Sequence, residues 1–211
     1  MMKKKILAAT CAAVALQLGS ALPVTPWEAA CAPRPVLAVP VAEAAASWHE
    51  DIEEATKDDT MAFGIYIGKP LQTFIDDFTS KGWQRSNNYG KTIAFQKDRG
   101  AYLIAVVVHP HENNKNLVGN YDIRFHIKDR NTADEMYMMA EKNFSYNFGR
   151  PNVKRGNDNR VWFINDTFSL LIEYNEYDPR MSLVKNFPYE VVVKRQMGDF
   201  KRFFQAKQLR N

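Results

Sequence analysis

Cysteine is nearly absent from this chain. Its 211 residues include only two, Cys11 and Cys31, and both precede the part that reads as a folded domain. From residue 45 onward this absence excludes disulfide bonds, a thiolate nucleophile and a cysteine-ligated metal. A domain of about 167 residues without such links must be held together by its hydrophobic core, and that size is sufficient.

The sequence also lacks an apolar run of the roughly 20 residues that a membrane-spanning helix needs. The apolar run at 6–18 is shorter and follows three lysines at 3–5, a pattern typical of a signal peptide. We predict removal of a Pro/Ala-rich leader after Ala44, with Ala21 as the alternative cleavage site. The mature protein would then be secreted or periplasmic.

A strong charge of one sign is missing as well. Lys and Arg number 28 against 24 Asp and Glu, a net charge of +4. This composition excludes a strongly basic nucleic-acid-binding protein. The charges are uneven, because acidic residues gather at 45–60 and basic residues after residue 193.

Recognisable catalytic motifs are missing too. The chain contains no GxSxG nucleophile elbow and no glycine-rich phosphate loop. Asp76 and Asp77 are neighbours on a predicted helix, so they point about 100° apart and do not form a pair of catalytic acids. We therefore expect a binding function rather than an enzyme, and we assign no catalytic residues.

Two segments have the apolar period of a helix, residues 70–82 and 131–149. The second opens with Thr132 and Glu135 at the spacing of a capping box. A glycine ends each segment, which suits the left-handed residue that terminates many helices. The apolar residues on one face are Leu71, Phe74, Ile75 and Phe78 in the first helix and Met136, Ala140, Phe144 and Phe148 in the second.

Most of the remainder alternates as strands joined by short turns. Two of these strands are expected to pair as a hairpin, with His109 facing Asn120 and His126 facing Leu103. The two histidines, His109 and His126, would then lie roughly 20 Å apart, since a strand rises about 3.4 Å per residue. The predicted strands cover 63–67, 92–97, 101–109, 121–128, 160–164, 167–174 and 189–194.

The order helix, meander, helix, meander predicts an α+β fold. We expect two layers, with antiparallel β-meanders packed against two main helices in the manner of a duplicated helix-plus-meander unit. In element order the chain resembles bacterial inhibitors of the β-lactamase-inhibitor type, a resemblance that implies fold but not function. The predicted parts are the signal peptide and leader (1–44), an acidic N-terminal segment (45–60), the α+β domain (61–195) and a basic C-terminal helix or tail (196–211).

The stretch VVVHPHEN offers a candidate metal site. His109 and His111 are two residues apart at a strand end, so both imidazoles can point to one side, and Glu112 follows. These ligand types suit zinc or copper. Because a closed structural zinc site needs four ligands, we favour a polar hairpin rim without a cofactor. A metal-binding protein or metal-dependent enzyme is the alternative.

The C-terminus offers a candidate binding segment. Phe200, Lys201, Arg202, Phe203 and Phe204 mix bases with aromatic rings, which suits a peripheral anionic membrane surface or an acidic partner. Alternatively, the rings pack on the domain while the basic groups extend into solvent.

Four aromatic residues fit no apolar period: Trp83, Tyr89, Tyr146 and Tyr177. If they cluster, they would form a binding face, since Trp and Tyr contribute strongly at interfaces. Together these features predict an exported bacterial protein that acts as a non-catalytic protein-binding or envelope interaction module. Its partner would be an unknown protein or envelope component.

Overall fold

The computed structural model describes residues 41–90, 92–156, 158–178, 180 and 182–199, with side chains from Trp48 onward. Within these residues the helices are α1 (Val41–Thr56), α2 (Leu71–Ser80) and α3 (Arg130–Phe148). The strands are β1 (Met61–Ala62), β2 (Ile65–Tyr66), β3 (Gln84–Ser86), β4 (Ile93–Asp98), β5 (Tyr102–Pro110), β6 (Val118–Ile127), β7 (Val153–Arg155), β8 (Asn159–Phe163), β9 (Phe168–Glu176) and β10 (Tyr189–Met197).

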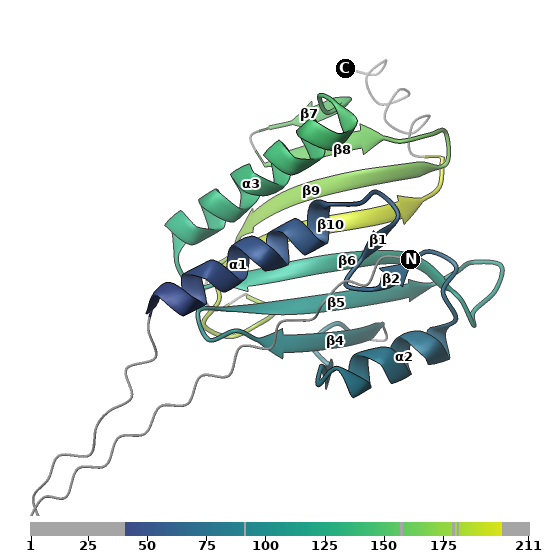
Figure 1. Ribbon diagram of the computed structural model, residues 1–211, viewed down its shortest axis with the longest axis horizontal. Helices are drawn as coiled ribbons and strands as arrows, with labels where there is room; N and C mark the ends of the chain where they lie inside the picture. The colour runs from purple at the N-terminus through teal and green to yellow at the C-terminus, as the bar shows by residue number, and fades with distance from the viewer. Residues whose placement is uncertain (1–40, 91, 157, 179, 181, 200–211) are drawn as a thin grey trace, which may run out of the picture. The chain divides into compact units, whose positions relative to one another are not determined.

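Eight strands form one antiparallel sheet in the order β3-β4-β5-β6-β10-β9-β8-β7 (Figure 1). It consists of two four-stranded meanders, each preceded by a helix, which meet where β6 pairs with β10. Corresponding strands have matching lengths: 3, 6, 9 and 10 residues in the first meander and 3, 5, 9 and 9 in the second. The predicted α+β fold and its repeated helix-plus-meander order are confirmed.

The predicted pairing of the central hairpin is also confirmed. Leu103 lies opposite His126, and His109 lies opposite Asn120. A one-residue slip would turn every apolar side chain of the strand to the wrong face, so the alternating pattern determines the register.

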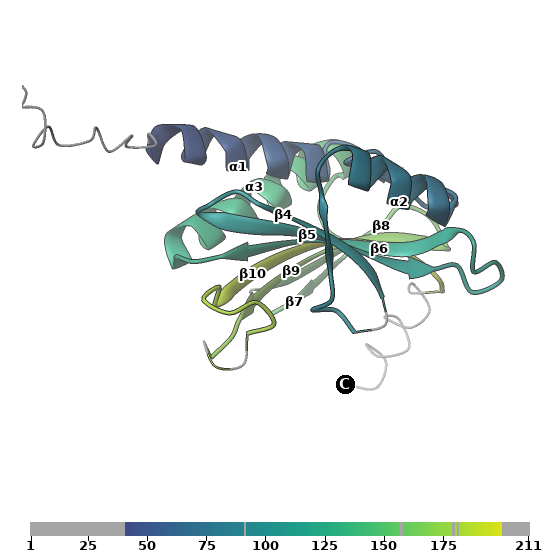
Figure 2. The same ribbon diagram turned by 90° about the horizontal axis from the view of Figure 1, so that it is seen from below.

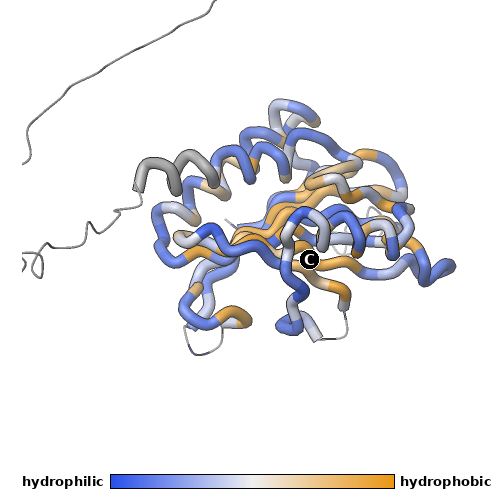
Figure 3. Tube along the Cα trace, turned by 60° about the horizontal axis from the view of Figure 1, so that its bottom comes forward, coloured by the Kyte–Doolittle hydropathy of each residue, from blue (hydrophilic) through white to orange (hydrophobic). Residues whose placement is uncertain are grey.

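The helices lie on one face of the sheet, and the β3–β4 and β9–β10 loops project from the other (Figure 2). The core lies between the helices and the sheet. Figure 3 shows the apolar residues concentrated on the central strands. Fully buried residues of this core include Phe74 and Phe78 of α2, Phe125 of β6, Phe144 of α3 and Trp162 of β8.

Helix α1 covers most of the acidic segment predicted at 45–60, and one face of this helix is buried. Trp48, Ile52 and Ala55 are buried in the core, and their spacing of four and three residues gives one helical face. Asp51 is buried as well, because its carboxylate accepts hydrogen bonds from Tyr102 Oη at 2.6 Å and Arg99 Nη2 at 2.9 Å. The domain therefore has a third helix, and one face of it belongs to the core.

Three element ends differ from the sequence predictions. The cap of α3 is Asp129, which accepts from the backbone N–H of Thr132 at 2.9 Å, so Thr132 lies inside the helix. The strand predicted at 63–67 is a hairpin of β1 and β2 with its turn at Phe63. Strand β10 continues through Met197, so it includes the first two residues of the segment predicted as a helix or tail.

Candidate functional site

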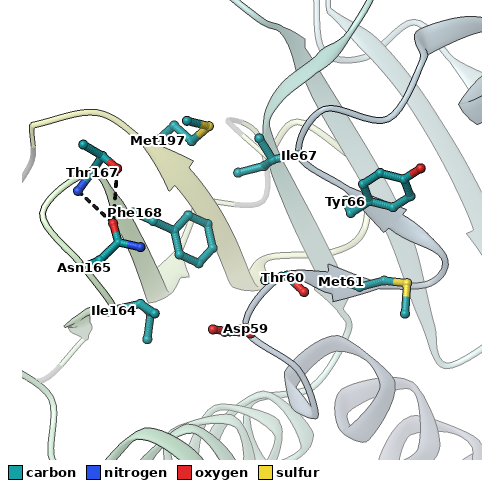
Figure 4. A pocket seen from close by; sticks show the side chains of 10 residues that line it. All are labelled: Asp59, Thr60, Met61, Tyr66, Ile67, Ile164, Asn165, Thr167, Phe168 and Met197. Carbon is teal, nitrogen blue, oxygen red and sulfur yellow. Dashed lines mark hydrogen bonds between the residues drawn. The ribbon is translucent and has the colours of Figure 1, made fainter.

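An apolar cleft opens at one end of the sheet, with a cavity volume of about 450 Å³. In Figure 4, Ile164, Asn165 and Phe168 of the β8–β9 hairpin face Ile67 and the β1–β2 hairpin across it. The complete lining is Asp59, Thr60, Met61, Tyr66, Ile67, Ile164, Asn165, Thr167, Phe168 and Met197.

The first wall of the cleft is the β1–β2 hairpin. Phe63 and Gly64 occupy its turn with φ of 53° and 79°, the left-handed conformation that a two-residue hairpin turn needs at both positions. Buried Lys69 holds this turn to α2, because its Nζ donates to the Gly64 carbonyl at 2.7 Å and to Asp77 Oδ2 at 2.6 Å. The hydrogen bond from Lys69 lowers the pKa of Asp77.

The same wall is tied to the sheet by Arg195, which is fully buried on the helix-covered face of β10. Its guanidinium donates to the carbonyls of Ala55 at 3.0 Å and Asp59 at 2.9 Å, and also to that of Asp58. The Ala55 carbonyl lies in the last turn of α1, where a helix leaves its acceptors unsatisfied, and Asp58 and Asp59 follow the helix. Arg195 thereby positions the loop that carries the Asp59–Met61 part of the cleft.

The second wall is the β8–β9 turn. The Asn165 side chain accepts from the backbone N–H of Thr167 at 2.9 Å, which rigidifies the turn. The Thr167 carbonyl accepts from the Gly198 N–H at 2.9 Å. The chain therefore leaves β10 directly beside the cleft.

The cleft gathers exposed apolar side chains. Six large hydrophobic residues are exposed among those that the structure describes, and three of them line the cleft: Met61, Tyr66 and Met197, each about 40% exposed. The methionines are flexible and polarizable, so they can adapt to differently shaped apolar partners. These side chains give the cleft an exposed apolar surface.

A smaller hollow of about 260 Å³ adjoins the cleft, and Thr167 and Met197 line both. Its other side is the β5–β6 loop, with His111 and Glu112. Gly119 is required beneath this loop, because a Cβ there would lie 2.8 Å from the His111 Cα. We call the cleft and this hollow together the loop rim.

The three candidate metal ligands lie at the end of β5 and in the loop that follows it. His109 lies on β5 opposite Asn120, and the pairing shifts between His109 and Pro110. His111 and Glu112 line the hollow, but His109 does not. No group of three or more His, Cys, Asp or Glu side chains is placed to hold a metal ion within the described part of the chain. The zinc or copper site remains a prediction without support from this geometry.

The other predicted binding residues, Phe200, Lys201, Arg202, Phe203 and Phe204, lie outside the described residues.

A buried ionic network that the sequence reading missed lies on the sheet face opposite the helices. Glu190 of β10 is fully buried, and its carboxylate accepts from Arg124 Nη1 at 3.1 Å, Asn175 Nδ2 at 3.0 Å and Tyr177 Oη at 2.8 Å. Arg124 also donates to Asp122 at 2.8 Å. Burial raises the pKa of Glu190, but Arg124 and His126 outweigh it, and the pKa is lowered.

His126 completes the network. It is 1% exposed, and its Nε2 lies 2.5 Å from Tyr89 Oη and 3.7 Å from the Glu190 carboxylate. Burial lowers the pKa of His126 to about 4, despite the opposing effect of Glu190. The imidazole is therefore neutral at physiological pH.

The four unplaced aromatic residues do not form one surface. Tyr89 of the β3–β4 loop and Tyr177 of the β9–β10 loop bond to the ionic network, and burial raises the pKa of both hydroxyls. Trp83 is in the core, and Tyr146 is 90% exposed on α3. Both hydroxyls bond to buried members of the network, so these contacts join the two loops to the sheet.

No protein-family model, curated protein or solved structure matches this chain. None of the helices within the described residues is long and apolar enough to cross a membrane.

Proposed function

We propose that this protein is an exported, non-catalytic binding module that holds a polypeptide segment of an envelope or secreted partner on its loop rim. The observation that carries the proposal is the apolar cleft, with its three exposed apolar side chains. Its volume lies within the roughly 300–1,000 Å³ typical of binding pockets.

The lining favours a polypeptide over a polar small molecule. Polar groups at the cleft already have partners: Asn165 is used in its own turn, and Thr60 bonds to Asp58 at 2.8 Å. Few polar groups remain to orient a polar ligand, whereas apolar anchors alone carry much of the energy at protein interfaces. The adjoining hollow, with His111 and Glu112, would take the polar part of the same segment.

Site-specific photocrosslinking in the native host tests this proposal. A photoreactive phenylalanine analogue at Tyr66 is expected to capture one discrete partner. The matched control is the same analogue at Tyr146, which is more exposed but lies on α3, away from the cleft. Equal capture from both positions, or none from Tyr66, would reject the loop rim as the binding surface.

A further inference from the structure

The sheet face opposite the helices carries apolar residues that the helix-covered core does not account for. Seven apolar side chains are at most 9% exposed yet lie outside that core. The described helices all lie on the other face (Figure 2). The seven residues are Ala94, Leu103, Ala105, Val107, Val161, Leu171 and Val192.

Two of these residues are adjacent at the β8–β9 side of the sheet. Val161 pairs with Leu171, and Leu171 pairs with Lys194 of β10. Phe163 is two residues beyond Val161 on the same strand and therefore points to the same face. Together, Val161, Phe163 and Leu171 form what we call the β8–β9 patch.

The β3–β4 and β9–β10 loops project from this face and contact it at the end away from the β8–β9 patch. Tyr89 bonds to His126 and Tyr177 to Glu190, and these two partners are paired on β6 and β10. Along β10, Glu190 lies near the start of the strand, whereas Lys194, opposite the patch, lies near its end.

The chain leaves the sheet close to this patch. Met197 ends β10 opposite Phe168, and the Gly198 N–H bonds to Thr167 beside the β8–β9 turn. The segment 200–211 follows. It would be about 18 Å long as a helix, at 1.5 Å per residue. That length crosses the roughly 10 Å between β10 and β8, which are two strand spacings apart.

The chemistry of this segment complements the patch. Phe200, Phe203 and Phe204 have the i, i+3, i+4 spacing that places side chains on one side of a helical turn. Lys201 and Arg202 lie between them in the sequence.

We propose that residues 200–211 dock within the same molecule onto the β8–β9 patch, with their phenylalanine rings over Val161 and Leu171. The short connection keeps the segment at a high effective concentration near the patch. This inference does not depend on the function of the loop rim, because it concerns the sheet face and not the cleft.

Methyl-resolved NMR on the mature protein tests the docking. Two variants are compared with the parent: a truncation after Asp199, and a full-length Phe203→Leu/Phe204→Leu double variant that keeps apolar character but removes two rings. Leu171 and Val161 report on the patch. Leu170 and Ile172 are the matched controls, because they neighbour Leu171 on the same strand but belong to the helix-covered core.

Docking predicts that the Leu171 and Val161 methyl signals shift in both variants, several times more than those of Leu170 and Ile172. Unchanged patch signals would overturn the proposal. So would shifts confined to the Met61 and Met197 methyls, which would place the segment in the cleft. Shifts that disappear on dilution would assign the segment to a second copy and also overturn it. If the truncated chain fails to fold, the full-length double variant decides.

Discussion

Arg195 and Tyr121 are cross-strand partners near the end of the sheet, and the guanidinium carbon lies 5.4 Å from the centre of the tyrosine ring. Both side chains serve the same loop. Tyr121 Oη donates to the carbonyls of Thr60 at 3.1 Å and Ile65 at 3.2 Å, while Arg195 binds the carbonyls that end α1. This buried pair joins the sheet to one wall of the cleft.

Replacement of Arg195 by Met is expected to lower the free energy of unfolding by about 3 kcal/mol, because several buried carbonyls lose their donor. Urea denaturation measures the change. Arg180→Met is the matched control: its side chain is 90% exposed, and surface substitutions usually change stability by less than about 0.5 kcal/mol. Equal effects of the two substitutions would contradict the anchoring role of Arg195.

Neutralising Glu190 is expected to be costly. Glu190→Gln leaves the Arg124 charge buried without its main partner, and breaking a buried pair on one side costs about 3–5 kcal/mol. The comparison is Glu176→Gln, at an exposed carboxylate 4.0 Å from Arg130, which should cost less than about 1 kcal/mol. Chemical denaturation at pH 7 gives both values, and a loss below 1 kcal/mol for Glu190→Gln would show that the network contributes little.

The stability of the fold should fall as the pH drops from 6.5 towards 4. The unfolded state binds a proton at His126 below pH 6.5, whereas the folded state resists it until about pH 4. The unfolded state therefore holds more protons in this window, so acid favours unfolding, by up to about 3 kcal/mol at 1.36 kcal/mol per pKa unit.

Denaturation between pH 7 and pH 5 separates this effect from the titration of carboxylates. His126→Gln removes the titrating group and should flatten the decline over this range. Tyr89→Phe removes the hydroxyl partner of His126 but keeps the imidazole, so a decline should persist. A decline of unchanged steepness in His126→Gln would assign the acid sensitivity to other groups.

The sequence predicted the sheet better than the cleft. The alternation of Ile123, Phe125 and Ile127 with polar residues determines face and register, so the pairing of His109 with Asn120 followed from local pattern. The cleft is assembled from separate segments near residues 60, 165 and 197, and no local pattern joins them.

Two missed features did leave a signal. Trp48, Ile52 and Ala55 have helical spacing, but the acidic residues around them suggested a solvated segment or helix without a buried face. Arg195 follows Val191 and Val193 at intervals of two, so strand alternation directs it into the core. The predicted strand nevertheless ended at Lys194, because a single buried cation is recognised only when its carbonyl partners are known.

The central claim is that the apolar side chains of the cleft hold a polypeptide partner. The most direct measurement is the affinity of the partner captured at Tyr66 for a Met61→Ser/Met197→Ser variant, by calorimetry. We expect binding at least tenfold weaker than the parent, about 1.4 kcal/mol. Met138→Ser, at an exposed methionine of α3 outside the cleft, should bind as the parent does. Unchanged affinity of the double variant would contradict the account.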